Sequence, residues 1–163
     1  MRYPSKERLF ELFEVNVASG TFLRRLPRGG RKAGEAVGCP DKNGYTKIRV
    51  DDVLYNRHIL VWIVATGSPP TKDIDHINTD KHDDRFENLR LASKIQNGAN
   101  RSKNKNNTSG LKGVYYDKRA KEWRASLIYD GKRRWVARGP CRAAVHLEYV
   151  VAANKLHGEF ARA

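Results

Sequence analysis

A chain of 163 residues with a net charge of +14 and an isoelectric point near 10 favours a nucleic-acid partner, or else an anionic membrane surface. The membrane is disfavoured, because no apolar run approaches the ~18 residues that a spanning helix needs, and charges interrupt the N-terminal stretch where a signal peptide would be apolar. We therefore expect a cytoplasmic protein of one or two small domains. Cys39 and Cys141 form no CxxC pair and cannot make a four-ligand zinc site, so we expect both to be reduced packing residues.

The first third of the chain is predicted to hold a short helix, a hairpin and a buried helix. Ser5 can cap a helix over residues 6–13. Apolar side chains on both sides of an Asp-Asp turn are typical of a β-hairpin over residues 45–55. The helix predicted next, over residues 57–66, is apolar nearly all round, which indicates the core of the first half.

A basic segment precedes that hairpin. Residues 27–44 are rich in glycine, proline, lysine and arginine, which predicts a loop. Arg28, Arg31 and Lys32 lie close together in it. Such charges are either solvated or follow a phosphate backbone, and the sequence alone leaves both interpretations open.

An acidic island interrupts the basic chain at residues 72–88, where six acids stand against three bases. A bound divalent cation would explain carboxylates where the partner is an anion, because the ion reverses the local charge. The surrounding sequence predicts a strand over residues 73–78, a polar loop, a second strand over residues 89–92 and then a helix. Ser93 is expected to open that helix with Gln96 in a capping box.

Four polar residues in and after this island could carry phosphodiester hydrolysis. Histidine is the side chain type that changes charge near neutral pH, so His76 can act as the general base that activates water. Asp75 offers the hard oxygen ligand that Mg²⁺ prefers, and Asn97 can bring a second from the helix. Asn88 can bond to backbone or imidazole and fix the orientation of His76. The opposing interpretation is an ordinary surface histidine, since adjacent strand residues point to opposite faces unless the strand ends there.

The second half of the chain changes to an alternating pattern. Residues 101–110 hold no large apolar side chain and are predicted to be a flexible basic linker. Three strands are predicted over residues 111–117, 122–130 and 132–138, followed by a helix. The apolar stripe of that helix is expected at Ala143, Ala144, Leu147, Val150, Val151 and Leu156. Residues 101–138 carry twelve Lys/Arg against three Asp/Glu, so the uncovered face of the sheet is expected to meet nucleic acid.

The motifs DH at 75–76, ENLR at 87–90 and QN at 96–97 resemble the HNH endonucleases of the ββα-metal class, in particular the homing-type branch with Asp before the first His. The resemblance covers about residues 19–100. It implies that His76 is the general base and that Asp75 and Asn97 hold one Mg²⁺ ion, or another divalent cation such as Mn²⁺. It also implies that Asn88 is the structural residue of the motif.

The segment from about residue 108 to 161 is similar to the APETALA2-type DNA-binding domain, which lays a three-stranded sheet in the major groove and covers it with a helix. The similarity rests on SGLKGVYYDKRAKEWRASL and the later AANKLHGEFA. It implies that Trp123 and Leu127 lie under the helix. With the basic loop and linker added, the expected DNA contacts are Arg28, Arg31, Lys32, Arg101, Lys103, Lys105, Lys112, Tyr115, Arg119, Arg124, Ser126, Arg133 and Trp135.

The sequence departs from both families at one place each. The first family often has His-Arg where this chain has His-Ile at 58–59, and we expect a structural role for His58. The second usually has a Gly-aromatic step after the third strand, where this chain has Gly-Pro-Cys at 139–141. The end and the register of that strand are therefore open.

We expect an α+β protein in which N-terminal hairpins and a helix lead into a ββα-metal HNH motif, followed by a small three-stranded antiparallel sheet packed on one helix. Residues 1–100 are the expected nuclease domain, with the motif at about 73–100. Residues 101–110 are the linker, and residues 111–163 the APETALA2-like domain. The expected activity is metal-dependent hydrolysis of double-stranded DNA by a phage-like homing endonuclease, a monomer in the cytoplasm or nucleoid of a bacterial host. A DNA-binding regulator that does not cut and an RNA-binding protein are the alternatives, and nicking versus double-strand cleavage is open.

Overall fold

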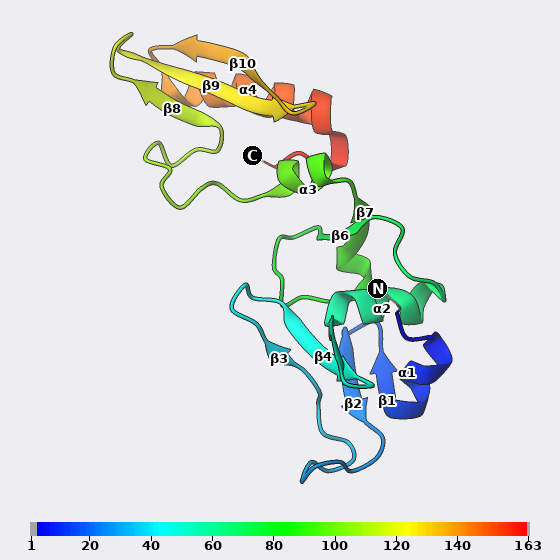
Figure 1. Ribbon diagram of the computed structural model, residues 1–163. Coiled ribbons are helices and arrows are strands. Elements are labelled where there is room, and N and C mark those ends of the chain that lie inside the picture. The colour runs from blue at the N-terminus through cyan, green and yellow to red at the C-terminus, as the bar shows by residue number, and fades with distance from the viewer. Residues whose placement is uncertain (1–2, 163) are drawn as a thin grey trace. The chain divides into compact units, whose positions relative to one another are not determined.

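The structure is a computed structural model that describes residues 3–162 (Figure 1). It combines helices with several small sheets, so the predicted α+β class is confirmed. The chain divides into two compact units, the first ending at Leu91 and the second beginning at Ala92. Within the described residues, no helix is both long enough and apolar enough to cross a membrane.

The first unit starts with a helix and a hairpin. Helix α1 (Lys6–Leu12) begins as predicted, because the Ser5 side chain accepts a hydrogen bond from the Arg8 backbone N–H at 3.1 Å. Strands β1 (Phe13–Asn16) and β2 (Thr21–Arg24) then pair in an antiparallel hairpin. The sequence pattern did not indicate β1, since its residues follow α1 without a break.

A three-stranded antiparallel sheet and one helix complete the core of the first unit. The sheet has the order β3 (Cys39–Pro40), β4 (Thr46–Val50) and β5 (Val53–Asn56). Helix α2 (Arg57–Thr66) follows and ends at Gly67, which adopts a left-handed φ of 78°. The predicted hairpin and buried helix are therefore confirmed. The buried side chains of α2 that join the core are Leu60, Val61, Ile63 and Val64.

A two-stranded sheet ends the first unit and carries the Asp-His pair. It consists of β6 (Asp73–His76) and β7 (Leu89–Ala92), the second preceded by a short 3-10 helix, η1 (Phe86–Asn88). Both strands were expected, but β6 ends at His76 instead of continuing to residue 78. The polar loop between them holds most of the acidic island.

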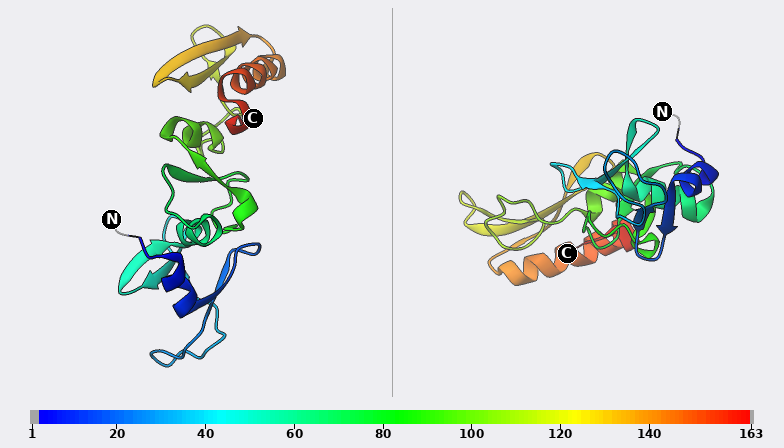
Figure 2. Two further views of the ribbon diagram at one scale, coloured as in Figure 1. Left: turned by 90° about the vertical axis from the view of Figure 1, so that its right-hand side faces the viewer. Right: turned by 90° about the horizontal axis from the view of Figure 1, so that it is seen from below.

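The second unit contains a short helix, a sheet and a long helix. Helix α3 (Lys94–Asn100) opens with the predicted capping box between Ser93 and Gln96. Strands β8 (Val114–Asp117), β9 (Glu122–Tyr129) and β10 (Lys132–Gly139) form an antiparallel sheet in the order β10-β9-β8. Helix α4 (Arg142–His157) lies along one face of this sheet, as Figures 1 and 2 show, and a 3-10 turn, η2 (Gly158–Phe160), follows it. The predicted sheet packed on one helix is thus observed.

The face that α4 turns to the sheet differs from the predicted stripe. Its buried side chains are Val145, Tyr149 and Ala153. Val150 and Leu156 of the predicted stripe are partly buried and pack against this cluster, whereas Leu147 and Val151 are exposed. The stripe was misplaced because α4 carries apolar residues all round, so periodicity does not select one face. Gly113 makes room for Tyr149, since a Cβ at Gly113 would overlap the Tyr149 ring.

Two smaller expectations also need correction. Cys39 and Cys141 are free thiols but both are exposed, so neither is a packing residue. The end of the predicted linker is tied to the sheet of the second unit, because the buried Ser109 hydroxyl donates to the backbone carbonyl of Val114 at 2.7 Å. A small hydroxyl can be buried where its hydrogen bonds are made within the loop.

Candidate functional site

Asp75 and His76 stand at the end of β6, and both are about 95% buried, each with a relative exposure of 5%. The strand ends at His76, which is the condition under which neighbouring residues can serve one site. Arg90 on the paired strand β7 donates from Nε to Asp75 Oδ2 at 3.0 Å, and its Nη2 lies at the same distance from that oxygen. A buried carboxylate needs such a partner, because removal from water disfavours its charge.

His76 is held by a carboxylate from the acidic loop. His76 Nε2 lies 2.8 Å from Asp84 Oδ1, and Arg57 Nε donates to Asp84 Oδ2 at 2.7 Å. The Asp84 side chain is fully buried. Burial alone would raise the pKa of Asp84, but the hydrogen bonds from His76 and Arg57 outweigh burial and lower it. Asp84 is therefore an ionised acceptor between two donors.

His58 completes a buried cluster beside this pair. Its Nδ1 lies 3.9 Å from Asp84 Oδ1, and its ring meets that of His76 edge-on with centroids 5.1 Å apart. Burial, and then the neighbouring His76, lower the pKa of His58 to about 4, so this imidazole is neutral near pH 7. Its Nδ1 is buried and has no hydrogen-bond partner among the residues that the structure describes.

The position of Asp84 is fixed from the other side by the β1–β2 turn. Gly20 in that turn has a φ of 68° and packs against the Asp84 backbone so closely that a Cβ would lie 2.5 Å from the carbonyl carbon. Two residues further, the Phe86 backbone N–H donates to the Val17 carbonyl at 3.0 Å. The N-terminal hairpin thus supports the loop that holds His76.

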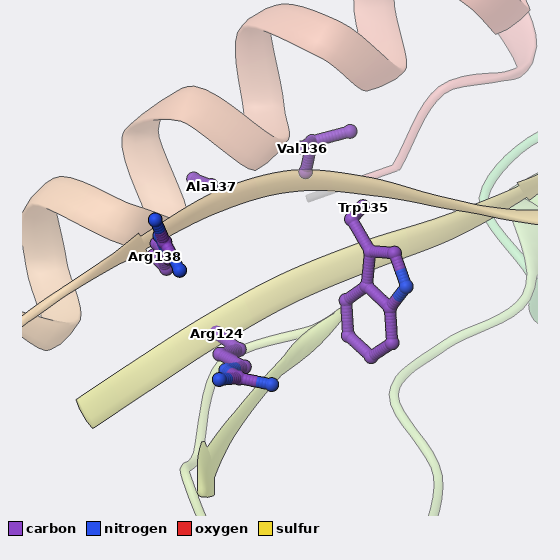
Figure 3. Close-up of a pocket in the computed structure, with 5 residues that line it drawn as sticks. All are labelled: Arg124, Trp135, Val136, Ala137 and Arg138. Carbon is purple, nitrogen blue, oxygen red and sulfur yellow. The ribbon is translucent and has the colours of Figure 1, made fainter. Parts of the chain in front are cut away.

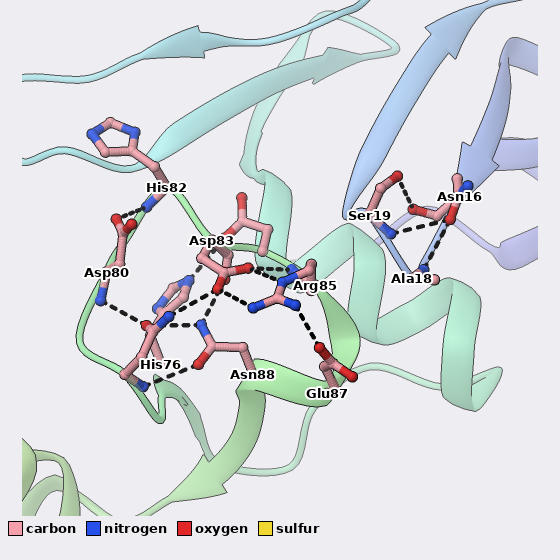
Figure 4. Close-up of polar contacts among 12 residues, drawn as sticks. Asn16, Ala18, Ser19, His76, Asp80, His82, Asp83, Arg85, Glu87 and Asn88 are labelled. Carbon is pink, nitrogen blue, oxygen red and sulfur yellow. Dashed lines mark hydrogen bonds and ion pairs between the residues drawn. The ribbon is translucent and has the colours of Figure 1, made fainter.

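Asn88 fastens the same loop, as Figure 4 shows. Its Oδ1 accepts from the Asn78 backbone N–H at 3.0 Å, and its Nδ2 donates to Asn78 Oδ1 at 3.0 Å and to the Asp83 carbonyl at 2.8 Å. Asn88 was expected to bond either to backbone groups or to the His76 imidazole. The hydrogen bonds described for its side chain go to backbone groups and to the Asn78 side chain. Asn88 therefore closes the turn that follows His76.

Two further acids of the island, Asp83 and Asp80, make contacts within the loop itself. Asp83 pairs with Arg85, whose hydrogen bond is the main reason why the pKa of Asp83 falls to about 2. Asp80 accepts from the backbone N–H of His82 at 2.9 Å (Figure 4). These contacts order the loop but leave Asp84 as the member that reaches His76.

Asn97 lies in α3, which belongs to the second unit. Its backbone N–H donates to the Ser93 carbonyl at 2.9 Å, as a first-turn helical residue does. Its role as a metal ligand stays a prediction.

The predicted nucleic-acid residues of the sheet share the face opposite α4. Cross-strand register places Tyr115 beside Arg124, and Ser126 beside Trp135. The exposed Trp135 ring lies 6.0 Å from that of Tyr115, centroid to centroid, and the Arg133 guanidinium lies 5.6 Å from the Trp135 centroid. Basic and aromatic side chains thus alternate on one surface, an arrangement that suits a nucleic acid.

A β-bulge adds a residue to this face that the alternation did not indicate. The register of β10 shifts between Trp135 and Ala137, so Arg138 lies opposite Arg124 instead of facing α4. A hollow of about 430 Å³ is lined by these residues together with Val136. Figure 3 shows Trp135 pointing away from α4 and Val136 toward it.

The other predicted DNA contacts are spread over three segments. Arg28, Arg31 and Lys32 are exposed in a basic loop that projects from the first unit (Figures 1 and 2). Arg101, Lys103, Lys105 and Arg119 are exposed in the second unit. Lys112 differs, because its Nζ donates to the Ala99 carbonyl at 2.6 Å and burial lowers its pKa to about 8. Its ammonium is used inside the second unit.

Sequence reasoning missed three residues of the site: Asp84, Arg90 and His58 as a neighbour of His76. Asp84 was predicted to be one acid of a polar loop, and no local pattern distinguishes it from the other acids of the island. Arg90 lies inside the ENLR motif, on the strand predicted to pair with the strand of Asp75, so the sequence did offer a signal for it. The contact between His58 and Asp84 carried no local signal, because it joins separate segments.

Comparisons with known proteins bear on the same region. Residues 55–99 match the family described as HNH endonuclease. Over 111 residues, or 65% of this chain, the protein is 39% identical to Protein 3.8 of Escherichia phage T7, and the match covers 88% of that protein. No solved structure matches the chain. The chain therefore belongs to the family of this phage protein and carries an HNH endonuclease domain.

Proposed function

We propose that the protein is a metal-dependent endonuclease that hydrolyses phosphodiester bonds in double-stranded DNA, with His76 as its general base. The observation that carries the proposal is the buried chain of contacts from Arg57 through Asp84 to His76 within the HNH match. A surface histidine would need no such support. General bases are recognised by a partner that fixes the ring and its tautomer.

The tautomer follows from the charge of Asp84. An ionised carboxylate can only accept, so the hydrogen on His76 lies on Nε2 and points to Asp84 Oδ1. The lone pair of a neutral His76 then lies on Nδ1. That nitrogen would take the proton from water as the water attacks phosphorus. The imidazolium that forms is stabilised by Asp84, which lies 2.8 Å from the opposite nitrogen.

The proposed ligands of a divalent cation are Asp75, the neighbour of His76 in β6, and Asn97. Asp75 would hold it through its carboxylate and Asn97 through its side-chain amide oxygen, both being ligands suited to Mg²⁺ or Mn²⁺. Such an ion, when bound, supplies charge to stabilise the phosphoryl oxygens and the leaving oxygen. Arg90 donates a hydrogen bond to the Asp75 carboxylate and so holds it in place. Asn88 holds the turn after His76 and so supports the orientation of the base.

The basic surfaces are proposed to bring DNA to this site. The sheet face around Trp135 would read a groove in the manner of an APETALA2-like domain over residues 111–163, joined by the basic segment 101–110 to the nuclease domain over residues 1–100. The loop with Arg28, Arg31 and Lys32 would contact phosphates. We further propose a homing-type role in a bacterial host, in its cytoplasm or nucleoid, for a protein that acts as a monomer.

A nicking assay tests the proposal. With Mg²⁺, the unaltered protein should cut plasmid DNA that contains its target, and EDTA should stop it. A general base typically contributes about 10²–10⁴-fold to the rate, so His76→Ala should lower the cleavage rate by at least this factor. Its DNA affinity should be nearly unchanged. His82→Ala, which removes an exposed histidine of the same loop, is the matched control and should cut normally.

The same assay separates the proposal from its main rival. Specific DNA binding without any metal-dependent product would identify a regulator that does not cut. Cleavage retained by His76→Ala would refute the assignment of the base. Competition between duplex DNA and RNA for binding would decide against the third possibility, an RNA-binding protein.

A further inference from the structure

The buried cluster of His58, His76 and Asp84 offers more than support for a base. One donor atom from each residue lies within 4.8 Å of the donor atoms of the other two. His76 Nε2 and His58 Nδ1 lie 2.8 and 3.9 Å from Asp84 Oδ1. In a tetrahedral zinc site, ligand atoms about 2.0–2.1 Å from the ion are separated by roughly 3.4 Å, so the observed distances bracket the required value.

A second observation points to a ligand at this place. His58 Nδ1 is buried, is directed at the cluster and makes no hydrogen bond among the described residues. Buried polar atoms without a partner are uncommon in folded proteins and ask for an explanation. Asp84 cannot meet this need as the structure stands, because 3.9 Å is beyond hydrogen-bond distance.

We propose that His58, His76 and Asp84 form a second metal site, selective for Zn²⁺ or a similar transition-metal ion, whose occupation switches off the nuclease. The donor set carries the choice of metal, because two imidazole nitrogens with one carboxylate suit Zn²⁺, Co²⁺ or Ni²⁺, whereas Mg²⁺ prefers oxygen ligands throughout. The site is distinct from the oxygen ligands proposed for the catalytic ion, since it uses neither Asp75 nor Asn97.

Binding there would remove the base by a shift of one proton. Zn²⁺ would take the lone pair of His76 Nε2, so the hydrogen of the neutral ring moves to Nδ1 and no proton is lost overall. His58 binds through Nδ1 and keeps its hydrogen on Nε2. Asp84 exchanges its hydrogen bond from His76 for a bond to the ion and keeps its contact with Arg57. With Nδ1 of His76 protonated, the ring could no longer accept a proton from water.

Metal binding itself does not depend on the proposed nuclease activity, and only the inhibition rests on that function. Binding is measured with Co²⁺, whose visible absorption reports tetrahedral nitrogen and oxygen ligands, after long incubation because all three side chains are buried. The protein carries Cys39→Ser and Cys141→Ser, since exposed thiols would bind the same ions. We expect one Co²⁺ per chain, displaced by Zn²⁺ and unaffected by millimolar Mg²⁺.

Variants locate the ion. His58→Ala should weaken Co²⁺ binding at least tenfold, and His58→Phe, which refills the ring space beside Tyr45, should do the same if the alanine variant folds poorly. His82→Ala should bind as the parent does. Absence of a one-to-one Co²⁺ spectrum, or a spectrum that both His58 variants leave unchanged, would overturn the site.

The nicking assay supplies the second arm. Micromolar Zn²⁺ should inhibit Mg²⁺-dependent cleavage by the parent protein, and the His58 variants should need at least tenfold more Zn²⁺ for the same inhibition. Co²⁺ binding without any inhibition by Zn²⁺ would support the metal site and speak against His76 as the base, so the two proposals fail separately.

Discussion

Gly20→Ala should reduce DNA cleavage although Gly20 contacts no catalytic group directly. The new methyl group would lie 2.5 Å from the Asp84 carbonyl carbon and 2.6 Å from its oxygen, so the backbone that carries Asp84 must move. The left-handed backbone costs about 1–2 kcal/mol with a Cβ, and the overpacking adds about 1–3 kcal/mol. A displacement of roughly 1 Å passed to His76 would lower the cleavage rate by about 10²-fold.

Gly67→Ala is the matched control for this variant. Gly67 has a φ of 78°, close to the 68° of Gly20, but no atom lies within 4 Å of the position that a Cβ would take there. Gly67→Ala therefore brings backbone strain without a collision. Urea unfolding should show a loss for both variants, larger for Gly20→Ala. Cleavage per folded molecule should fall only for Gly20→Ala. Equal cleavage by the two folded variants would refute the argument that the β1–β2 turn positions the base.

Three further predictions concern pH, the guanidinium beside Asp75 and the sheet face. The pKa of His58 falls from 6.5 to about 4 on folding, so the unfolded chain takes up a proton at higher pH than the folded chain. The free energy of unfolding should therefore decrease by about 3 kcal/mol as the pH falls from 6.5 to 4, at 1.36 kcal/mol per pKa unit. His58→Gln should flatten this part of the stability–pH curve, and an unchanged slope would contradict burial of a neutral ring. Arg90→Ala removes the partner of a buried carboxylate and should cost about 3–5 kcal/mol, and Mg²⁺ should raise the melting temperature more in this variant than in the parent, whereas equal shifts would speak against Asp75 as a ligand. Arg138→Ala should reduce the slope of log binding constant against log salt concentration by about one unit, measured by DNA titration at several salt concentrations. Arg134→Ala, on the α4 side of the same strand, should leave this slope unchanged. Equal effects of the two variants would refute a DNA-facing sheet.

Local signals in the sequence predicted most of the secondary structure. Ser5 and Ser93 each begin a helix by accepting a backbone N–H three residues on, and Gly67 ends one in a left-handed conformation, so these limits needed no tertiary information. The face of α4 did need it. Its apolar residues surround the helix, and the orientation is set by the space above Gly113 that the Tyr149 ring fills.

The candidate site divides in the same way. Motif spacing alone points to Asp75, His76 and Asn88, and their roles stay predictions. It does not indicate Asp84, because the importance of Asp84 arises from contacts with Arg57 and with the β1–β2 turn, which lie far away in the chain. The bulge in β10 is a similar case, since simple alternation cannot show that Arg138 faces outward.

The boundary after Leu91 bears on how such proteins can be recombined. The HNH match runs to residue 99, so it continues past the point where the first compact unit ends. A chimaera joined at that point would take Asp75 and His76 from one parent and Asn97 from the other. A joint within residues 101–106 would keep the whole motif from a single parent and, lying before Ser109, would spare the hydrogen bonds that anchor the sheet. The segment that must come from a single parent to keep the HNH motif whole therefore ends later in the chain than the first compact unit.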